Sequence, residues 1–125
     1  MSKSKDTPFN QVYAIVQKIP RGKVLTYGEI SRLMDKRLSA AAVGWAMRAL
    51  PAETGKKGQN GQNYPFNSHN VPWHRVINSR GQVSTNNEPN IPSGLQQSLL
   101  EAEGIVFDSA GTINLESYLW RARDD

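Results

Sequence analysis

Two short helices separated by a tight polar turn constrain this chain more than any other feature of its sequence. Residues 27–34 form the first predicted helix, where Thr26 and a glutamate three residues later make a capping box. Residues 40–50 form the second, with Ser39 as its predicted cap and a proline directly after it. Residues 35–38, between the two helices, form the predicted turn. This arrangement predicts a helix-turn-helix motif, whose second helix is the one that contacts DNA.

Two more helices are predicted, one on either side of this motif. Apolar residues recur at helical spacing from residue 9 to residue 19, and a proline and a glycine follow closely. Leucines at helical spacing predict a helix over residues 94–103, with Ser93 as its cap and Gly104 as the residue that ends it. The chain is therefore expected to be mainly α-helical.

The remaining segments carry weaker patterns. Residues 105–107 and 112–115 flank a turn and predict a small β-hairpin near the end of the chain. Residues 52–70 are rich in glycine, asparagine, glutamine and lysine without periodicity, which indicates a long flexible loop. This loop either contacts a partner or DNA, or is an inert insertion. We expect a single domain over residues 9–120, with tails at residues 1–8 and 121–125.

Positive charge is concentrated in the first half of the sequence. The chain has 15 Lys and Arg residues against 11 Asp and Glu residues. The basic residues between positions 18 and 57 are Lys18, Arg21, Lys23, Arg32, Lys36, Arg37, Arg48, Lys56 and Lys57. That stretch holds few acidic residues, whereas acidic residues predominate from position 99 onward. The asymmetry fits a face that binds a polyanion such as DNA, and it fits an ordinary solvated surface equally well.

The sequence contains no cysteine, which excludes disulfides, thiolate metal sites and every cysteine nucleophile. Its two histidines, His69 and His74, are too few for a zinc site built from histidine, so we expect no metal and no cofactor. No apolar run approaches the roughly 18 residues of a membrane span. The first ten residues also lack the apolar stretch of a signal peptide. A protein of the cytoplasm or nucleus, without a membrane partner, is expected.

Four segments resemble, in the same order, those of the O6-alkylguanine-DNA alkyltransferases. Residues 20–30 resemble the start of the helix-turn-helix of that family, and residues 42–47 resemble its recognition helix. Residues 71–77, Val-Pro-Trp-His-Arg-Val-Ile, resemble the active-site motif Pro-Cys-His-Arg-Val. Residues 93–104 resemble the helix that carries a buried glutamate. The resemblance runs from residue 9 to about residue 107. It implies the winged helix-turn-helix-like C-terminal domain of these enzymes, mainly α with a small β-hairpin.

Trp73 stands where that motif has its nucleophilic cysteine, which is the mark of the alkyltransferase-like proteins. In that family the domain binds O6-alkylguanine in double-stranded DNA and flips the nucleotide out. It then passes the site to nucleotide excision repair proteins. Because an indole N–H is only a hydrogen-bond donor, we expect damage recognition without alkyl transfer. We also expect the protein to act as a monomer. His74, Arg75 and Glu103 match residues around the family's nucleophile, and here we expect them to form a structural network.

The resemblance and the chemistry of the side chains together mark two overlapping sets of site residues. The lesion pocket is expected from Trp73, Tyr27, Met47, Val71, Pro72, Val76, Val83 and Ser93. The DNA contacts are expected from Tyr27, Thr26, Ala40, Ala41, Ala42, Trp45 and Arg48. Small side chains on the recognition helix suit the narrow minor groove, whereas a major-groove reader would carry Arg, Asn or Gln there. Tyr27 matches the family tyrosine that helps to rotate the nucleotide out of the stack.

Ala41 departs from the family pattern, which has an arginine at this position. That arginine enters the base stack and replaces the flipped base. Arg37, Trp45 and Arg48 are candidates to take over, and the sequence does not choose between them. Some relatives also place a basic residue beside the base, near positions that read Thr-Asn-Asn-Glu at 85–88 here. Lesion affinity and lesion preference are therefore left open.

Two other functions compete with damage recognition. A helix-turn-helix transcription regulator would prefer a sequence in undamaged DNA and would usually bind as a dimer. The alanine-rich recognition helix argues against this function. An enzyme such as a glycosylase would use a flipped-base pocket, but it needs a carboxylate or lysine directed at the sugar. The sequence does not place such a residue.

Overall fold

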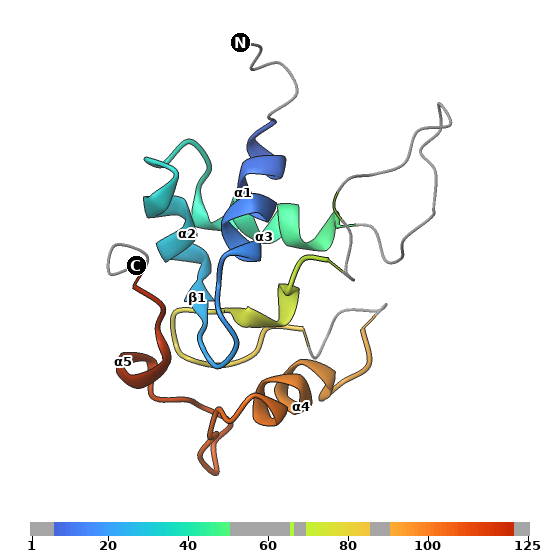
Figure 1. Ribbon diagram of the computed structural model, residues 1–125, viewed down its shortest axis with the longest axis vertical. Coiled ribbons are helices and arrows are strands. Elements are labelled where there is room, and N and C mark those ends of the chain that lie inside the picture. Colours follow the sequence, from blue (N-terminus) through green and yellow to red (C-terminus); the bar gives the residue numbers. More distant parts are fainter. Residues whose placement is uncertain (1–6, 51–65, 67–69, 86–90, 122–125) are drawn as a thin grey trace.

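The computed structural model describes residues 7–50, 66, 70–85 and 91–121 (Figure 1). The elements are α1 (Pro8–Gln17), β1 (Leu25–Thr26), α2 (Tyr27–Leu33), α3 (Ala40–Arg48), the 3-10 helix η1 (Trp73–Arg75), β2 (Val76–Ile77), α4 (Leu95–Ala102) and α5 (Leu115–Tyr118). The expected mainly helical fold is confirmed. Most of the predicted loop at residues 52–70, and most of both predicted tails, lie outside the described residues.

Hydroxyl side chains begin the first three helices. Thr7, Thr26 and Ser39 each accept a hydrogen bond from the backbone N–H three residues further on, at 3.1 Å. Such caps satisfy N–H groups that have no partner within the helix. The caps predicted at Thr26 and Ser39 are therefore confirmed, and α2 and α3 begin where the sequence indicates.

The turn between α2 and α3 reverses the chain in few residues. Asp35 and Lys36 both adopt positive φ angles, of 55° and 62°, which non-glycine residues reach at a cost of about 1 kcal/mol each. The Ser31 hydroxyl at the end of α2 stabilises this turn by donating to the carbonyl oxygen of Leu38, at 2.7 Å. The result is the predicted helix-turn-helix, with α3 as its second helix.

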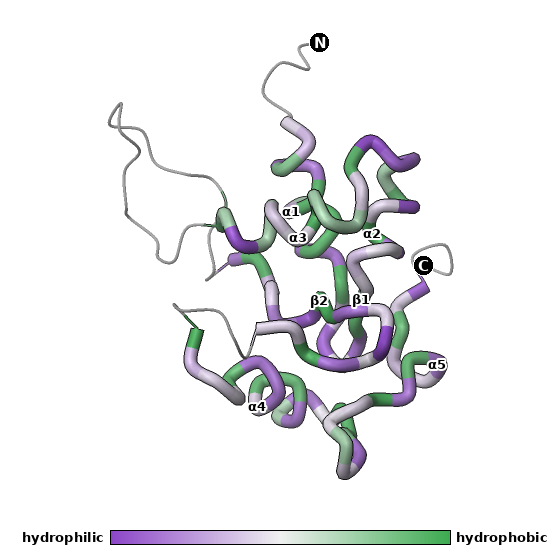
Figure 2. The backbone as a smooth tube through the Cα atoms, turned by 180° about the vertical axis from the view of Figure 1, so that it is seen from behind, coloured by the Kyte–Doolittle hydropathy of each residue, from purple (hydrophilic) through white to green (hydrophobic). Residues whose placement is uncertain are grey.

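Two hydrophobic clusters form the core. Helices α1, α2 and α3 lie on one side of the short two-stranded sheet, and α4 lies on the other (Figures 1 and 2). The first cluster joins α1, α2 and α3 through side chains such as Val12, Ile30 and Val43. The second contains Leu100 of α4 and Ile113 from the segment before α5. The chain thus has a helix-turn-helix half and a half built on α4, and the sheet lies between them.

The sheet corrects the predicted β-hairpin. Its strands, β1 and β2, are parallel and pair Leu25 with Val76 and Thr26 with Ile77. Residues 105–107 and 112–115 form no strand. In the second segment the N–H of Ile113 donates to the carbonyl of Gly81, at 2.9 Å, and not to the first segment. A Cβ at Gly81 would lie 2.8 Å from the Ile113 carbonyl oxygen, so only glycine allows this approach.

The start of α4 also differs from the prediction, whereas its end does not. Gly94, at φ 86°, precedes the first helical residue, and no side chain caps it, so Ser93 is not the cap. At the other end Gly104 adopts φ 94°, as expected for the residue that ends the helix. The N–H groups of Gly104 and Ile105 donate to Glu101 and Leu100, which is a Schellman motif. α4 carries both hydrophobic and hydrophilic residues, as Figure 2 shows, which fits a helix with one buried and one exposed face. None of the helices described is long and apolar enough to cross a membrane.

Candidate nucleic-acid interface

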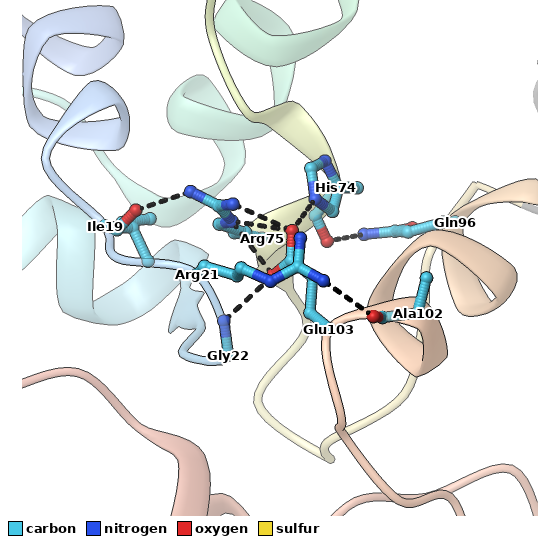
Figure 3. A network of polar contacts seen from close by, with 8 residues as sticks. All are labelled: Ile19, Arg21, Gly22, His74, Arg75, Gln96, Ala102 and Glu103. Atoms are coloured by element: carbon cyan, nitrogen blue, oxygen red, sulfur yellow. Dashed lines mark hydrogen bonds and ion pairs between the residues drawn. The ribbon is translucent and has the colours of Figure 1, made fainter.

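A buried carboxylate anchors η1 from one side. The Glu103 side chain is 5% exposed and lies at the end of α4, facing His74 and Arg75 (Figure 3). The Arg75 Nε donates to both carboxylate oxygens at 3.1 Å, and a terminal nitrogen donates to Oε2 at 2.8 Å. The His74 Nε2 lies 2.7 Å from Oε2. The N–H of Gly22, in the loop after α1, donates to Oε1 at 2.9 Å. One carboxylate therefore connects three segments of the chain.

These contacts decide the charge of Glu103. Burial alone would raise the pKa of this carboxyl, because it disfavours the charged form. Hydrogen bonds from Arg75, from the Gly22 N–H and from His74 act in the opposite direction and prevail. They lower the pKa of Glu103 from 4.5 to about 2. Glu103 is therefore a carboxylate at neutral pH, fully used by its partners.

The backbone of η1 and β2 is anchored from a second direction by Gln96, which is fully buried in α4. Its side-chain N–H groups donate to the carbonyls of His74 and Val76, at 3.0 and 2.8 Å. Its Oε1 accepts from the Thr85 hydroxyl at 2.9 Å. Gln96 is not among the predicted site residues, although a glutamine among the leucines of a predicted core helix is a usable signal. Among the described residues, no buried side-chain nitrogen or oxygen lacks a partner.

The other side of η1 opens into a cavity of about 660 Å³. A volume of this size lies within the range of pockets that bind small molecules, so it can hold a nucleobase. Trp73, half-buried, lines it from η1, and α3 lines it from the opposite direction. The lining residues are Tyr27, Ala40, Ala41, Gly44, Trp45, Met47, Arg48, Leu50, Trp73, Val76, Ser84, Thr85, Ile91, Pro92 and Leu95.

Tyr27 connects the helix-turn-helix to the far wall of this cavity. It is the first residue of α2, and its hydroxyl lies 2.5 Å from the hydroxyl of Ser84. On α3, Ala40, Ala41 and Gly44 present little or no side chain to the cavity, whereas Trp45 and Arg48 present large ones. Aromatic walls and a guanidinium can receive a base and a phosphate.

The structure places most of the predicted site residues at one cavity or in one network, and the others elsewhere. Trp73, Tyr27, Met47 and Val76 line the cavity, and so do Ala40, Ala41, Trp45 and Arg48. The structure also brings His74, Arg75 and Glu103 into direct contact. Ala42, half-buried, does not line the cavity, although it lies on α3.

Several predicted site residues lie away from the cavity. Val71 is buried in the first hydrophobic cluster, and Val83 packs against the second, so neither is a wall of the cavity. Pro72 precedes η1, and Ser93 is exposed before α4; neither lines the cavity. Thr26 is buried in β1, and its hydroxyl caps α2, which removes it from the surface that could contact DNA.

Other lining residues were missed because they surround a segment with little pattern. Ile91, Pro92 and Leu95 form the wall contributed by the start of α4 and the residues before it. Ser84 and Thr85 contribute a neighbouring wall. The sequence places Leu95 inside the predicted helix over residues 94–103 and the other four residues between predicted elements, and only the packing of α4 against η1 brings the start of α4 to the cavity.

A helix-turn-helix whose second helix borders a base-sized cavity defines a class of DNA-binding domain, and comparison with known proteins identifies its family. The family model described as "6-O-methylguanine DNA methyltransferase, DNA binding domain" matches residues 7–105. Alkyltransferase-like protein 1 of Schizosaccharomyces pombe is 39% identical over 122 residues, which cover 93% of this chain and 96% of that protein. A DNA base-flipping protein of Vibrio parahaemolyticus is 37% identical, with 89% and 93% covered.

A solved structure agrees with these matches. The crystal structure of the S. pombe protein in complex with damaged DNA containing O6-carboxymethylguanine superposes with a TM-score of 0.65 at 39% identity. The superposition covers 90% of this chain and 94% of that one. The chain belongs to the 6-O-methylguanine DNA methyltransferase DNA-binding-domain family, within its alkyltransferase-like, base-flipping branch. With no cysteine in its sequence, it has no thiol to accept an alkyl group.

Proposed function

We propose that this protein recognises O6-alkylguanine in double-stranded DNA and holds the flipped nucleotide in the cavity beside Trp73, without repairing it. The observation that carries the proposal is the position of Trp73 in that cavity, on a turn held by Glu103 and Gln96. The indole replaces a nucleophile with an apolar, aromatic wall, which suits an alkylated base edge. The solved relative with damaged DNA supports the same ligand class.

The docking mode follows from the residues around the cavity mouth. The small face of α3 lets the helix approach the minor groove closely, and Arg48 lies at its end, where it can bind a phosphate. Tyr27 lies between α3 and the cavity wall that contains Ser84. Its hydroxyl can leave Ser84 and bind the phosphate of the rotated nucleotide instead. Flipping costs a few kcal/mol and costs less for a damaged pair, which favours the lesion over guanine.

A titration tests this function directly. We expect the protein to bind a duplex with one O6-methylguanine more tightly than the same duplex with guanine, in a fluorescence anisotropy titration at one stated salt concentration. We also expect the lesion to remain alkylated after long incubation, which mass spectrometry of the recovered strand would check. Equal affinities would overturn the proposal. A preference for one undamaged sequence would instead favour the transcription regulator, and alkali-sensitive strand breaks would favour a glycosylase.

The bound complex then serves as a signal for other proteins. Since the chain has no thiol to remove the lesion, repair requires a partner, and we propose nucleotide excision repair proteins on the strength of the family. We also propose that the protein acts as a monomer, in the cytoplasm or nucleus, wherever the DNA lies. Co-precipitation of excision repair proteins with the protein on lesion DNA, but not on undamaged DNA, tests the partner. Light scattering of the free protein and of the complex tests the oligomeric state.

A further inference from the structure

Trp45 lies exposed in the middle of the helix that faces the proposed DNA site. Its side chain is 59% exposed, and among the described residues Val106 is the other large hydrophobic residue that is exposed. Val106 lies after α4, next to the hydroxyl of Tyr118 and away from the cavity. Trp45, in contrast, lines the rim of the cavity. The position of this indole, more than its exposure, indicates a role in binding.

The surroundings of Trp45 leave room for DNA to reach it. On α3 it lies one turn after Ala41 and one residue after Gly44, both of which line the same cavity. Helical side chains lean toward the N-terminus of their helix, so the indole is expected over the turn that contains Ala41. A methyl group there leaves the space in front of the indole open. The helix thus offers one large flat side chain beside a face of small ones.

A flipped nucleotide leaves a gap in the base stack, whose bases are about 3.4 Å apart along each strand. A flat aromatic ring has the thickness of a base and stacks on any base, because every base has a π face. Apolar side chains are used as wedges between base steps by many minor-groove proteins. The methyl group of Ala41 is too small to fill such a gap, whereas the indole of Trp45 can.

We propose that Trp45 inserts into the stack beside the flipped nucleotide and occupies the gap that the nucleotide leaves. This inference rests on the proposed function, since it needs a nucleotide in the cavity. The two nearby arginines have other positions. Arg37 lies in the turn before α3 and donates to Gln11 at 3.2 Å. Arg48 lies one turn beyond Trp45, where a cation suits a phosphate.

Substitution of Trp45 by alanine tests the proposal, with Val106→Ala as the matched control. Because both side chains are exposed, both variants are expected to fold, and thermal melts check this. We expect Trp45→Ala to bind the O6-methylguanine duplex roughly 5- to 150-fold more weakly, the range for loss of one aromatic–base stack. Val106→Ala binds as the unaltered protein does. Equal losses in the two variants, or none in Trp45→Ala, would overturn the proposal.

A duplex with an abasic site separates insertion into the stack from contact with the flipped base. There the gap already exists and the cavity receives no base. If Trp45 fills the gap, Trp45→Ala retains its loss on this duplex, whereas Trp73→Ala loses far less than on the lesion duplex. If Trp45 merely touches the flipped base, both variants bind the abasic duplex like the unaltered protein, and the proposal is wrong. Surface contact with another protein predicts no DNA effect at all.

A conservative variant completes the series. Trp45→Phe keeps a flat ring and should recover most of the affinity that Trp45→Ala loses, while Trp45→Leu should recover less because it cannot stack. Equal recovery by both would mean that a flat ring is not needed, and would contradict a ring that stacks in the place of the flipped base. Failure of the proposed function appears separately, as equal binding of lesion and undamaged duplex by the unaltered protein. Failure of this inference appears as lesion preference that does not depend on Trp45.

Discussion

The two sides of η1 differ in nearly every physical respect, although three consecutive residues form it. On one side His74 and Arg75 meet the Glu103 carboxylate in a closed, polar and fully paired network (Figure 3). On the other side Trp73 faces an open cavity with aromatic and small side chains. Buried charge pairs that are fully hydrogen-bonded hold a geometry, whereas an open apolar wall is free to bind. One side of η1 therefore stabilises the fold, and the other side is available to recognise a ligand.

The largest expected effect is on the network side. Glu103→Gln leaves Arg75 as a half-buried cation without its carboxylate, and loss of one partner of such a pair costs about 3 kcal/mol of unfolding free energy. Denaturant unfolding measures it. Glu101→Gln removes the same charge two residues away on the exposed face of α4, and it should change stability by less than about 0.5 kcal/mol. Similar losses in both variants would mean that the network is not what stabilises η1.

Acid should weaken the network side before it weakens the cavity side. The folded pKa of Glu103, about 2, lies below its ordinary 4.5, so the carboxylate stabilises the folded state above pH 4.5. That stabilisation is lost as pH falls from 4.5 through about 2. Unfolding free energies measured across this range should therefore decline, and the decline should be shallower in Glu103→Gln. Parallel curves for the two proteins would show that Glu103 does not carry this pH dependence.

On the cavity side the expected loss is in binding and not in stability. Trp73→Ala should weaken binding to the O6-methylguanine duplex by about 1–3 kcal/mol, the range for one aromatic contact with a base. Its unfolding free energy should fall less than that of Glu103→Gln, because Trp73 is only half-buried. Trp73→Phe, which keeps an aromatic wall, serves as control and should lose less affinity. If Trp73→Ala lost as much unfolding free energy as Glu103→Gln, the two sides of η1 would not differ in their effect on stability.

The smallest expected effect concerns the Tyr27 hydroxyl. Tyr27→Phe keeps the ring at the cavity mouth and removes the hydroxyl that we expect to leave Ser84 and bind the phosphate, so lesion affinity should fall by about 0.5–1.5 kcal/mol, the worth of one hydrogen bond. Stability should hardly change. Tyr118→Phe, whose hydroxyl accepts from the N–H of Val106 far from the cavity, is the matched control and should bind DNA normally. If Tyr27→Phe bound the lesion duplex as tightly as the unaltered protein, only the ring of Tyr27, and not its hydroxyl, would contribute to binding.

Local signals were enough to predict the helix-turn-helix but not the sheet. Thr26 and Ser39 act on N–H groups three residues away, so the sequence alone indicates where α2 and α3 begin. The partner of Leu25 is Val76, about fifty positions later, and nothing near either residue specifies that pairing. The segments predicted as a hairpin do have strand-like patterns. The N–H of Ile113, however, donates to Gly81 in a distant segment, and no local pattern reveals such a partner.

The part of the candidate site that lies in recognisable sequence motifs could be predicted. Trp73, Tyr27 and Arg48 belong to recognisable segments, and all three line the cavity. Val71 lies in the first hydrophobic cluster and not at the cavity, because an apolar segment of sequence does not say which of its side chains face the core and which face a cavity. Gln96 was missed because its partners, two carbonyls and a hydroxyl, come from elsewhere in the chain.

The anchoring of η1 has a practical consequence for protein engineering. The two residues that follow Trp73 are held by contacts in which the indole takes no part, through the Arg75–Glu103 pair and the Gln96 bond to the His74 carbonyl. Position 73 can therefore be randomised with little risk to folding. A library at this one position, screened against duplexes with different modified bases, would turn the domain into a set of affinity reagents for DNA lesions.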